Sequence, residues 1–216
     1  MKKILFFISI IFLGQYLAAQ STAQQAKKWL DDASAQMKSY KDVSILFNYS
    51  FINDRVKPAI KKNESGDLML KGQAYKLKFM GMEQISDGKM LYTILHEDEE
   101  VQKDPIDPNK PNGNALNPAN ILELYKKGFS YKLGGEEKLN GLAIVYIILK
   151  PNASEDLEYI QLGIVKTTKH LHSYEQKGRD GTITKFVVTS FKSNQNLPSN
   201  LFQFDPKKYP GYYIPK

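Results

Sequence analysis

GDLMLKGQAYKLKFMGMEQISDGKMLYTILH, residues 66–96, carries the clearest structural signal in this chain. Apolar and polar residues alternate along it, stop at the turn 86–89 (SDGK), and then alternate again. Alternation at period two is typical of antiparallel strands that have one apolar and one solvated face. The apolar face packs either on a filled core or on the wall of a cavity, and the pattern alone leaves both open.

The N-terminus predicts export. Residues 1–20 combine Lys2 and Lys3, the short apolar run 4–14 and the small-residue segment 17–19. This order indicates a signal peptide, 1–20, cleaved after Ala19 or Gln20. The run is short for a membrane span, so a retained anchor is the lesser alternative. We therefore expect a periplasmic, or else secreted, domain over residues 21–216.

The composition limits the classes of protein to which this chain can belong. The chain has 216 residues, 42% of them hydrophobic and 25% charged, as in a single globular domain. It has no cysteine, which excludes disulfides and a cysteine-linked lipid anchor. The net charge is +7, or +5 without the two lysines of the signal peptide. The lysines are scattered rather than clustered, so we expect no nucleic-acid partner.

The pattern predicts a mainly β (α+β) domain, with many antiparallel strands and two main helices in a curved or barrel-like sheet. A three- and four-residue apolar stripe indicates a helix over 21–41, and a second helix follows over 117–127. Loops are expected at 55–65 and 97–117, and a Gly134-Gly135 turn after strand 129–133. The other predicted strands are 42–53, 142–149 as a central strand, 157–166, 167–177 and 182–193.

Residues with catalytic chemistry are sparse. No phosphate loop, dinucleotide fingerprint or nucleophile elbow is present. His170 and His172 would share one strand face, and two solvated histidines are a better interpretation than a metal site. The sequence thus indicates a protein that is not an enzyme and has no cofactor or metal. What remains is a large number of aromatic side chains, 11 Phe and 13 Tyr.

Several short motifs resemble those of one family, in order along most of the chain. They are 66–68 (GDL), 85–92 (ISDGKMLY), 117–122 (NPANIL), 178–183 (GRDGTI) and 201–204 (LFQF) with Pro210-Gly211. The chain resembles the LolA family of periplasmic carriers, which shuttle acylated lipoproteins to the outer membrane. Residues 71–81 and 104–117 look like the version found in Bacteroidetes-type bacteria.

The resemblance implies an unclosed antiparallel half-barrel with an α-helical lid over a hydrophobic cavity for acyl chains. It also implies a monomer that takes cargo from an inner-membrane ABC-type transporter and releases it to an outer-membrane acceptor or to the membrane itself. The cavity wall is expected to comprise Trp29, Phe47, Tyr49, Phe51, Leu68, Leu70, Tyr75, Leu77, Phe79, Tyr92, Ile94 and Leu122. For each of them, ordinary core packing is the alternative.

One motif departs from the family. An Arg-Pro pair is usual after the second strand, where the arginine latches the lid to the sheet. This chain has Lys71-Gly72 there. Because lysine lacks the planar fork of arginine, we expect Lys71 to be a looser latch. Two other functions remain open: a periplasmic sensor of the kind that regulates an anti-sigma factor, and a general binding protein for apolar ligands.

Overall fold

The computed structural model describes residues 22–106, 118–153 and 156–215. They form an eleven-stranded antiparallel sheet in the order β6-β5-β4-β3-β2-β1-β11-β10-β9-β8-β7. The first half contains β1 (Val43–Asn53), β2 (Ile60–Lys71), β3 (Ala74–Phe79), β4 (Met82–Ser86), β5 (Met90–Leu95) and β6 (Glu100–Pro105). The second half contains β7 (Phe129–Leu139), β8 (Leu142–Pro151), β9 (Leu157–Val165), β10 (Leu171–Gly178) and β11 (Ile183–Ser193). The two halves join where β1 pairs with β11.

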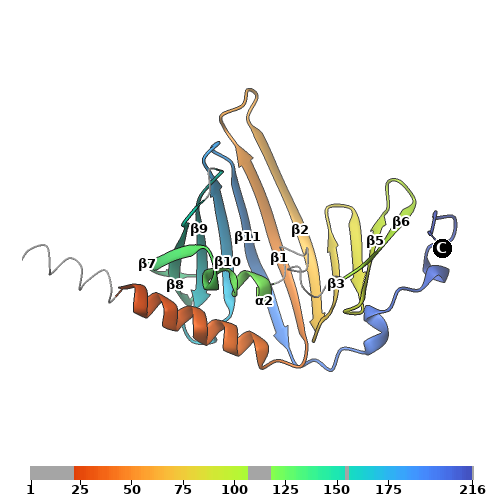
Figure 1. Ribbon diagram of the computed structural model, residues 1–216, viewed down its shortest axis with the longest axis horizontal. Helices are drawn as coiled ribbons and strands as arrows, with labels where there is room; N and C mark the ends of the chain where they lie inside the picture. The colour runs from red at the N-terminus through yellow and green to blue at the C-terminus, as the bar shows by residue number, and fades with distance from the viewer. Residues whose placement is uncertain (1–21, 107–117, 154–155, 216) are drawn as a thin grey trace, which may run out of the picture.

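The sheet is not closed, because β6 and β7 form its two edges and do not pair with each other (Figure 1). The N-terminal helix (22–38), α2 (Pro118–Ile121) and the 3-10 turn η1 (Leu124–Lys126) lie on one face of the sheet, beneath β7–β11 (Figure 1). We call these three elements the lid and the face that they cover the inner face. The predicted half-barrel with a helical lid is confirmed.

The lid packs because its apolar stripe meets apolar strands. Ala26, Leu30 and Ala33 recur at helical spacing and are almost fully buried. They contact the inner face of β8–β10 together with Ile121 and Leu122. This lid core is one of three hydrophobic clusters in the described residues. A second cluster covers the inner face of β1–β3.

The third cluster lies on the opposite, outer face. Tyr75 of β3 pairs with Ser86, whereas Lys76 pairs with Ile85, so Ile85 points away from the side that Tyr75 occupies. The C-terminal segment, with η2 (Ser199–Phe202) and η3 (Pro206–Lys208), packs on this outer surface of β4–β6. It also pairs with the edge of β6, where the amide of Val101 donates to the carbonyl of Tyr213 at 2.8 Å.

Several predicted boundaries were wrong. The loop expected at 55–65 ends earlier, since β2 starts at Ile60 and pairs with β1 although its first residues are polar and exposed. The acidic run after residue 96 is a hairpin turn that leads into β6, and not the start of a long loop. The second helix is short and breaks after Ile121.

Two strand predictions also need correction. The Gly134-Gly135 turn is instead a bulge within β7, which pairs with β8 on both sides of it. Residues 142–149 do carry the lid on one face, but β8 is next to the edge strand and is not central.

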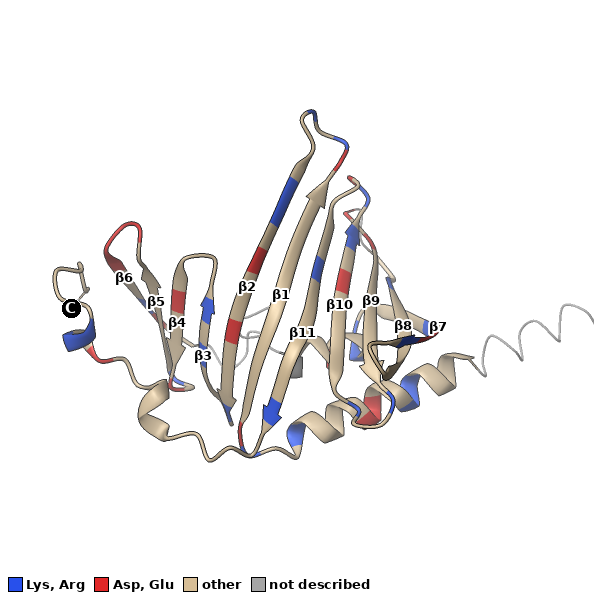
Figure 2. Ribbon diagram, turned by 180° about the vertical axis from the view of Figure 1, so that it is seen from behind, with Lys and Arg blue, Asp and Glu red and all other residues tan. Residues whose placement is uncertain are grey.

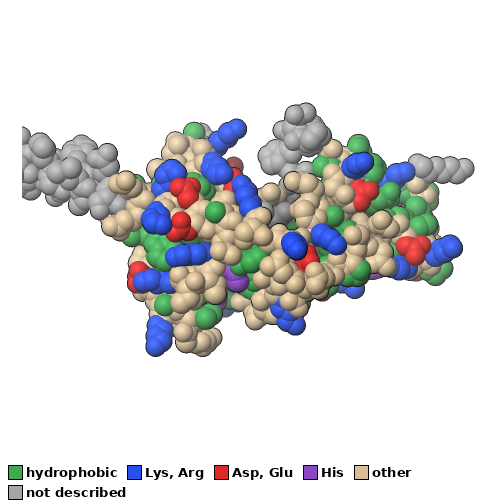
Figure 3. All heavy atoms as spheres, turned by 90° about the horizontal axis from the view of Figure 1, so that it is seen from below, with side chains coloured by type: hydrophobic (Ala, Val, Ile, Leu, Met, Phe, Trp, Pro, Cys, Tyr) green, Lys and Arg blue, Asp and Glu red, His purple; other side chains and the backbone are tan. Residues whose placement is uncertain are grey.

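The predicted signal peptide and most of the loop before α2 lie outside the described residues. Within the described part, no helix is long and apolar enough to cross a membrane. Figure 3, viewed from below, shows Lys and Arg side chains spread over that face without a single basic patch, in agreement with the scattered lysines of the sequence.

Candidate functional site

An apolar cavity lies between the lid and the sheet. Its wall combines residues of β1, β2, β10, β11 and α2, namely Ile45, Phe47, Leu68, Ile121, Leu171, Ser173, Tyr174, Phe186 and Val188. The volume is about 30 Å³, enough for roughly two water molecules at about 10–15 Å³ each. In this closed form the cavity is too small for an acyl chain.

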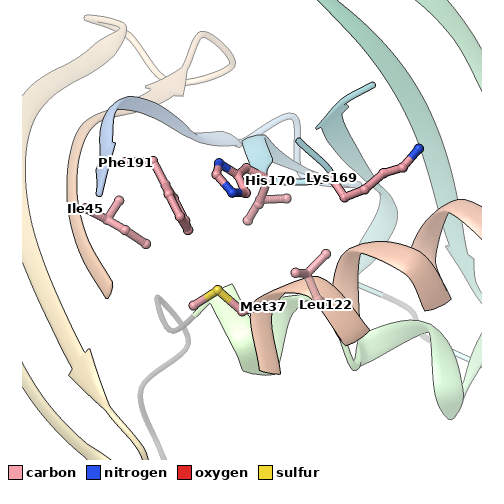
Figure 4. A pocket seen from close by; sticks show the side chains of 7 residues that line it. Met37, Ile45, Leu122, Lys169, His170 and Phe191 are labelled. Carbon is pink, nitrogen blue, oxygen red and sulfur yellow. The ribbon is translucent and has the colours of Figure 1, made fainter. Parts of the chain in front are cut away.

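A second, smaller pocket of about 10 Å³ adjoins it and shares Ile45 and Leu171. Met37 and Leu122 approach this pocket from the lid, while His170 and Phe191 approach it from the sheet (Figure 4). We call the contact between the end of the N-terminal helix and the β9–β10 turn the lid seam. The two pockets show where the lid and the sheet are least tightly packed.

Phe47 reaches the cavity because the neighbouring strand carries a glycine. Gly66 pairs with Phe47 across β1 and β2. A Cβ on Gly66 would lie 2.1 Å from Cζ of Phe47, so the ring rests directly on the glycine backbone. Any other residue at position 66 would push the ring away from this position.

A bulge in β11 turns two more side chains inward. Ile45 pairs with Phe191, but Phe47, two residues later, pairs with Val188. Thr189 is therefore an extra residue that shifts the phase of alternation. As a result Val188 lines the larger cavity and Phe191 lines the smaller pocket.

Aromatic rings continue from the cavity along the inner face towards the β1–β2 turn. Phe47 and Phe186 have ring centroids 5.7 Å apart, and Tyr49 lies 5.0 Å from Phe186 and 5.1 Å from Phe79. The ring of Tyr174 packs beside this row against Phe186 and also lines the cavity. Burial raises the pKa of Tyr174 to about 12, because the phenolate is disfavoured in this apolar environment.

The lid is held together by a polar cluster around Glu123. Its carboxylate accepts a hydrogen bond from Ser34 of the N-terminal helix and pairs with Lys38 at 2.8 Å and with Lys126. Burial alone would raise the pKa of Glu123, but the bonds from Lys126, Lys38 and Ser34 outweigh it and lower the pKa to about 2. The Tyr125 hydroxyl also donates to Asp31. These bonds join the elements of the lid into one unit.

Polar contacts also join the lid region to the sheet at the lid seam. The hydroxyl of Tyr40, just after the helix, lies 2.6 Å from Nε2 of His170, and the imidazole stacks on Phe191 with 3.8 Å between centroids. The Lys169 ammonium lies 3.5 Å from the centre of the Trp29 ring. Burial lowers the pKa of His170, which favours the neutral ring. The prediction of a solvated His170 was therefore wrong.

The predicted wall residues fall into four groups. Phe47 and Leu68 line the larger cavity, and Leu122 lines the smaller pocket. The adjoining inner-face cluster contains Tyr49, Leu70, Tyr75, Leu77 and Phe79. Trp29 packs against the lid core, and Phe51 is half-buried on β1 beyond the clusters.

Tyr92 and Ile94 form the fourth group and are not brought to the cavity. Ile94 is fully buried on the outer face under the C-terminal segment. The Tyr92 ring stacks on Phe204, with centroids 4.4 Å apart and planes 9° from parallel. Their place in the strand pattern is as predicted, but the face is the opposite one.

Lys71, expected as the lid latch, contacts the C-terminal segment instead. Its ammonium donates to the carbonyl of Leu197 at 2.5 Å and to the hydroxyl of Ser199 at 3.2 Å. In the described residues no contact of this ammonium with the lid is observed. Lys71 therefore anchors the start of the outer-face segment.

Sequence reasoning missed the contribution of β10 and β11 to the wall. Leu171, Tyr174, Phe186 and Val188 come from strands that were predicted, but without assignment to the cavity. The pattern of β1 could have indicated this contribution. Ile45 and Phe47 lie on one face of β1, so the strand that pairs with β1, which is β11, must supply the neighbouring part of the wall. Within the described residues, no three His, Asp or Glu side chains converge as metal ligands.

No protein-family model matches the chain. Its sequence is 28% identical over 125 residues to the outer-membrane lipoprotein carrier protein of Legionella pneumophila (strain Lens), covering 57% of this chain and 58% of that protein. The matching protein of strain Corby is 28% identical over the same length. The chain thus spans less than two-thirds of the curated relatives that it matches.

Two solved structures share the fold. An uncharacterized conserved protein from Thermus thermophilus superposes with a TM-score of 0.60 at 12% identity, covering 88% of this chain and 98% of that one. The lipoprotein LppX of Mycobacterium tuberculosis superposes with a TM-score of 0.53 at 12% identity, covering 82% of this chain and 98% of that one. At such identities the likeness concerns the fold alone.

Proposed function

We propose that this LolA-like protein binds the acyl chains of lipoproteins between its lid and its inner face. The observation that carries the proposal is an uncharged apolar cavity whose wall comes from both the lid and the sheet. A space of this kind opens when the lid moves, and the surface then exposed is apolar and aromatic. The protein would act by binding alone, without catalysis.

The energetics support reversible binding. Each methylene transferred from water to an apolar surface contributes about 0.8 kcal/mol, so an acyl chain gains several kcal/mol by displacing the lid. The lid in turn offers its own apolar stripe to the same inner face. Lid and cargo therefore compete for one surface, and this competition allows release as well as capture.

The route of the cargo also belongs to the proposal. We place the protein in the periplasm, where it would receive lipoproteins from an inner-membrane ABC-type transporter. It would pass them to an outer-membrane acceptor or to the membrane itself, as a monomer and without any nucleic-acid partner. Support comes from the Legionella relative, whose name is outer-membrane lipoprotein carrier protein, and from the export signal predicted from the sequence.

Native mass spectrometry tests the binding. The protein is mixed with a triacylated lipoprotein and, separately, with the same lipoprotein lacking its acyl chains. A one-to-one complex with the acylated form alone is expected. Absence of a complex from folded protein would refute carriage.

Two aromatic variants locate the binding face. Phe186→Ala removes a ring from the cavity wall and is expected to weaken the complex. Phe204→Ala removes a ring of the outer-face cluster and should leave the complex unchanged. Equal loss in both variants would mean that the inner face has no special part in binding.

A further inference from the structure

The β1–β2 hairpin projects beyond the other hairpins of the sheet (Figure 1). Large apolar side chains are exposed at its tip, with Val56 at 39% and Ile60 at 43% of their full accessible surface. Met80, in the β3–β4 turn at the same end of the sheet, is 48% exposed. Met80 lies below the tip, whereas Val56 and Ile60 expose apolar surface at the most prominent point of the fold, and such a position indicates an interaction surface.

This tip is also basic. Residues 54–62 (DRVKPAIKK) contain four cations, Arg55, Lys57, Lys61 and Lys62, and one acid, so that their net charge is +3. Figure 2, in which the ribbon is coloured by residue type, shows Lys and Arg positions in blue at the tip and on the adjacent part of β2. Residues 54–62 are exposed throughout.

The tip is braced by the neighbouring turn. Nη1 of Arg55 donates to the carbonyl oxygen of Arg179 in the β10–β11 turn at 2.8 Å. The side chain of Arg55 also lies over Gly181, because a Cβ there would be 2.5 Å from its Nε. The two turns therefore support each other, and the apolar and basic side chains are presented from a fixed base.

We propose that the β1–β2 hairpin tip docks on an anionic lipid surface. Apolar side chains that enter the headgroup region and flanking cations that meet lipid phosphates are the two features by which peripheral proteins bind such membranes. Val56 and Ile60 supply the first feature and Lys57, Lys61 and Lys62 the second.

Two other turns of the described residues lack this combination. Leu139 and Leu142 are also exposed, at 38% and 42%, but the β7–β8 turn lies at the other end of the strands and follows Glu136 and Glu137. The β5–β6 turn, at the same end as the proposed tip, carries the acidic run 97–99. Charge thus selects the β1–β2 hairpin as the point of contact with an anionic membrane.

Docking at this tip would also orient the cavity. Phe51, Tyr49 and Phe47 follow one another down the same face of β1, from the tip side to the cavity wall. A membrane at the tip would therefore lie at the upper end of the aromatic row, where an acyl chain could enter. This orientation rests on the proposed function, whereas the docking itself does not.

Co-sedimentation with vesicles tests the proposal without any cargo. Purified protein is mixed with vesicles of phosphatidylcholine alone and of phosphatidylcholine with phosphatidylglycerol. We expect binding to the anionic vesicles that weakens as salt is raised. Each Lys or Arg near an anionic surface contributes about fivefold in partition, so Lys57→Gln/Lys61→Gln/Lys62→Gln should lower binding at least tenfold.

Matched variants distinguish binding through the tip from nonspecific adsorption to the vesicles. Val56→Ser/Ile60→Ser should abolish most binding, while Leu139→Ser/Leu142→Ser, of similar exposure at the opposite end, should leave it unchanged. Equal binding to both vesicle types, or equal losses in the two serine pairs, would overturn the proposal. The proposal would also be overturned if the protein failed to bind anionic vesicles but still formed the complex with the acylated lipoprotein. That outcome would leave the proposed function intact, and it would make a protein partner the occupant of the tip.

Discussion

Loosening the lid seam should strengthen acyl binding while it weakens the fold. Tyr40→Phe removes the hydroxyl that lies 2.6 Å from Nε2 of His170 and keeps the ring that packs beside Phe191. The same hydroxyl also accepts a hydrogen bond from Nε2 of Gln36 at 2.8 Å, and that bond does not cross the seam. The seam bond with His170 contributes about 1 kcal/mol to the stability of the closed form. The closed lid loses this contribution, but an acyl complex with the lid displaced has already given it up.

The two effects have opposite signs and similar size. A loss of about 1 kcal/mol in the closed form raises the apparent affinity for an acyl chain by up to about fivefold. The same loss lowers the melting temperature by about 2–4 °C for a domain of this size. Titration with a fluorescent fatty-acyl probe and thermal unfolding measure the two quantities on the same sample.

Tyr159→Phe is the matched control. The Tyr159 hydroxyl donates to Glu175 at 3.1 Å, and its neighbour Ile160 belongs to the lid core, so Tyr159 points to the outer face. This variant should lower the melting temperature without any change in probe affinity. If Tyr40→Phe lowers the melting temperature and leaves the affinity the same, the lid seam does not compete with cargo and the reasoning fails.

Three further outcomes are expected. Gly66→Ala should displace the Phe47 ring and lower the free energy of unfolding by about 1–3 kcal/mol in urea titrations; unchanged stability would contradict the contact. Because burial lowers the pKa of His170, the fold favours its neutral form and loses stability as pH falls below about 6.5. The urea midpoint of unfolding, followed by emission of Trp29, the only tryptophan, should therefore fall between pH 7.5 and 5.5, and a fall of the same size in His170→Gln would refute this cause. Lys71→Met should cost about 1–2 kcal/mol of stability and leave acyl affinity unchanged, whereas an affinity change would restore its role as a lid latch.

The sequence predicted those elements that carry a strong apolar period. The N-terminal helix was predicted because Leu30 and other apolar residues recur at helical spacing. β1 was predicted because Ile45 and its apolar neighbours alternate at period two, the spacing of a strand. The start of β2 was missed because side chains 60–65 are exposed on both faces, so backbone pairing alone holds it. β6 was missed because Val101 is its one buried residue, and a single apolar residue makes no pattern.

The face of a strand is harder to predict than the strand. Leu77 and Ile94 both belong to regular alternations, yet the first lies on the inner face and the second on the outer face. Period two fixes which residues share a face but not which layer covers that face. The layer that covers β4–β6 is the C-terminal segment, more than 100 residues later in the chain. No local sequence pattern in these strands predicts where that segment packs.

The distribution of polar contacts decides how the lid can move. Within the described residues, Glu123 and Asp31 tie the N-terminal helix to the segment that follows α2. Polar contacts with the sheet are also present at the seam, through His170 and Lys169. Because these polar bonds join the parts of the lid, we expect the lid to move as one body, and the main cost of opening is the loss of its apolar contacts with β8–β10. Opening should then expose the inner face of β8–β10 in a single step, and the apolar surface gained by cargo is the same surface that the lid gives up.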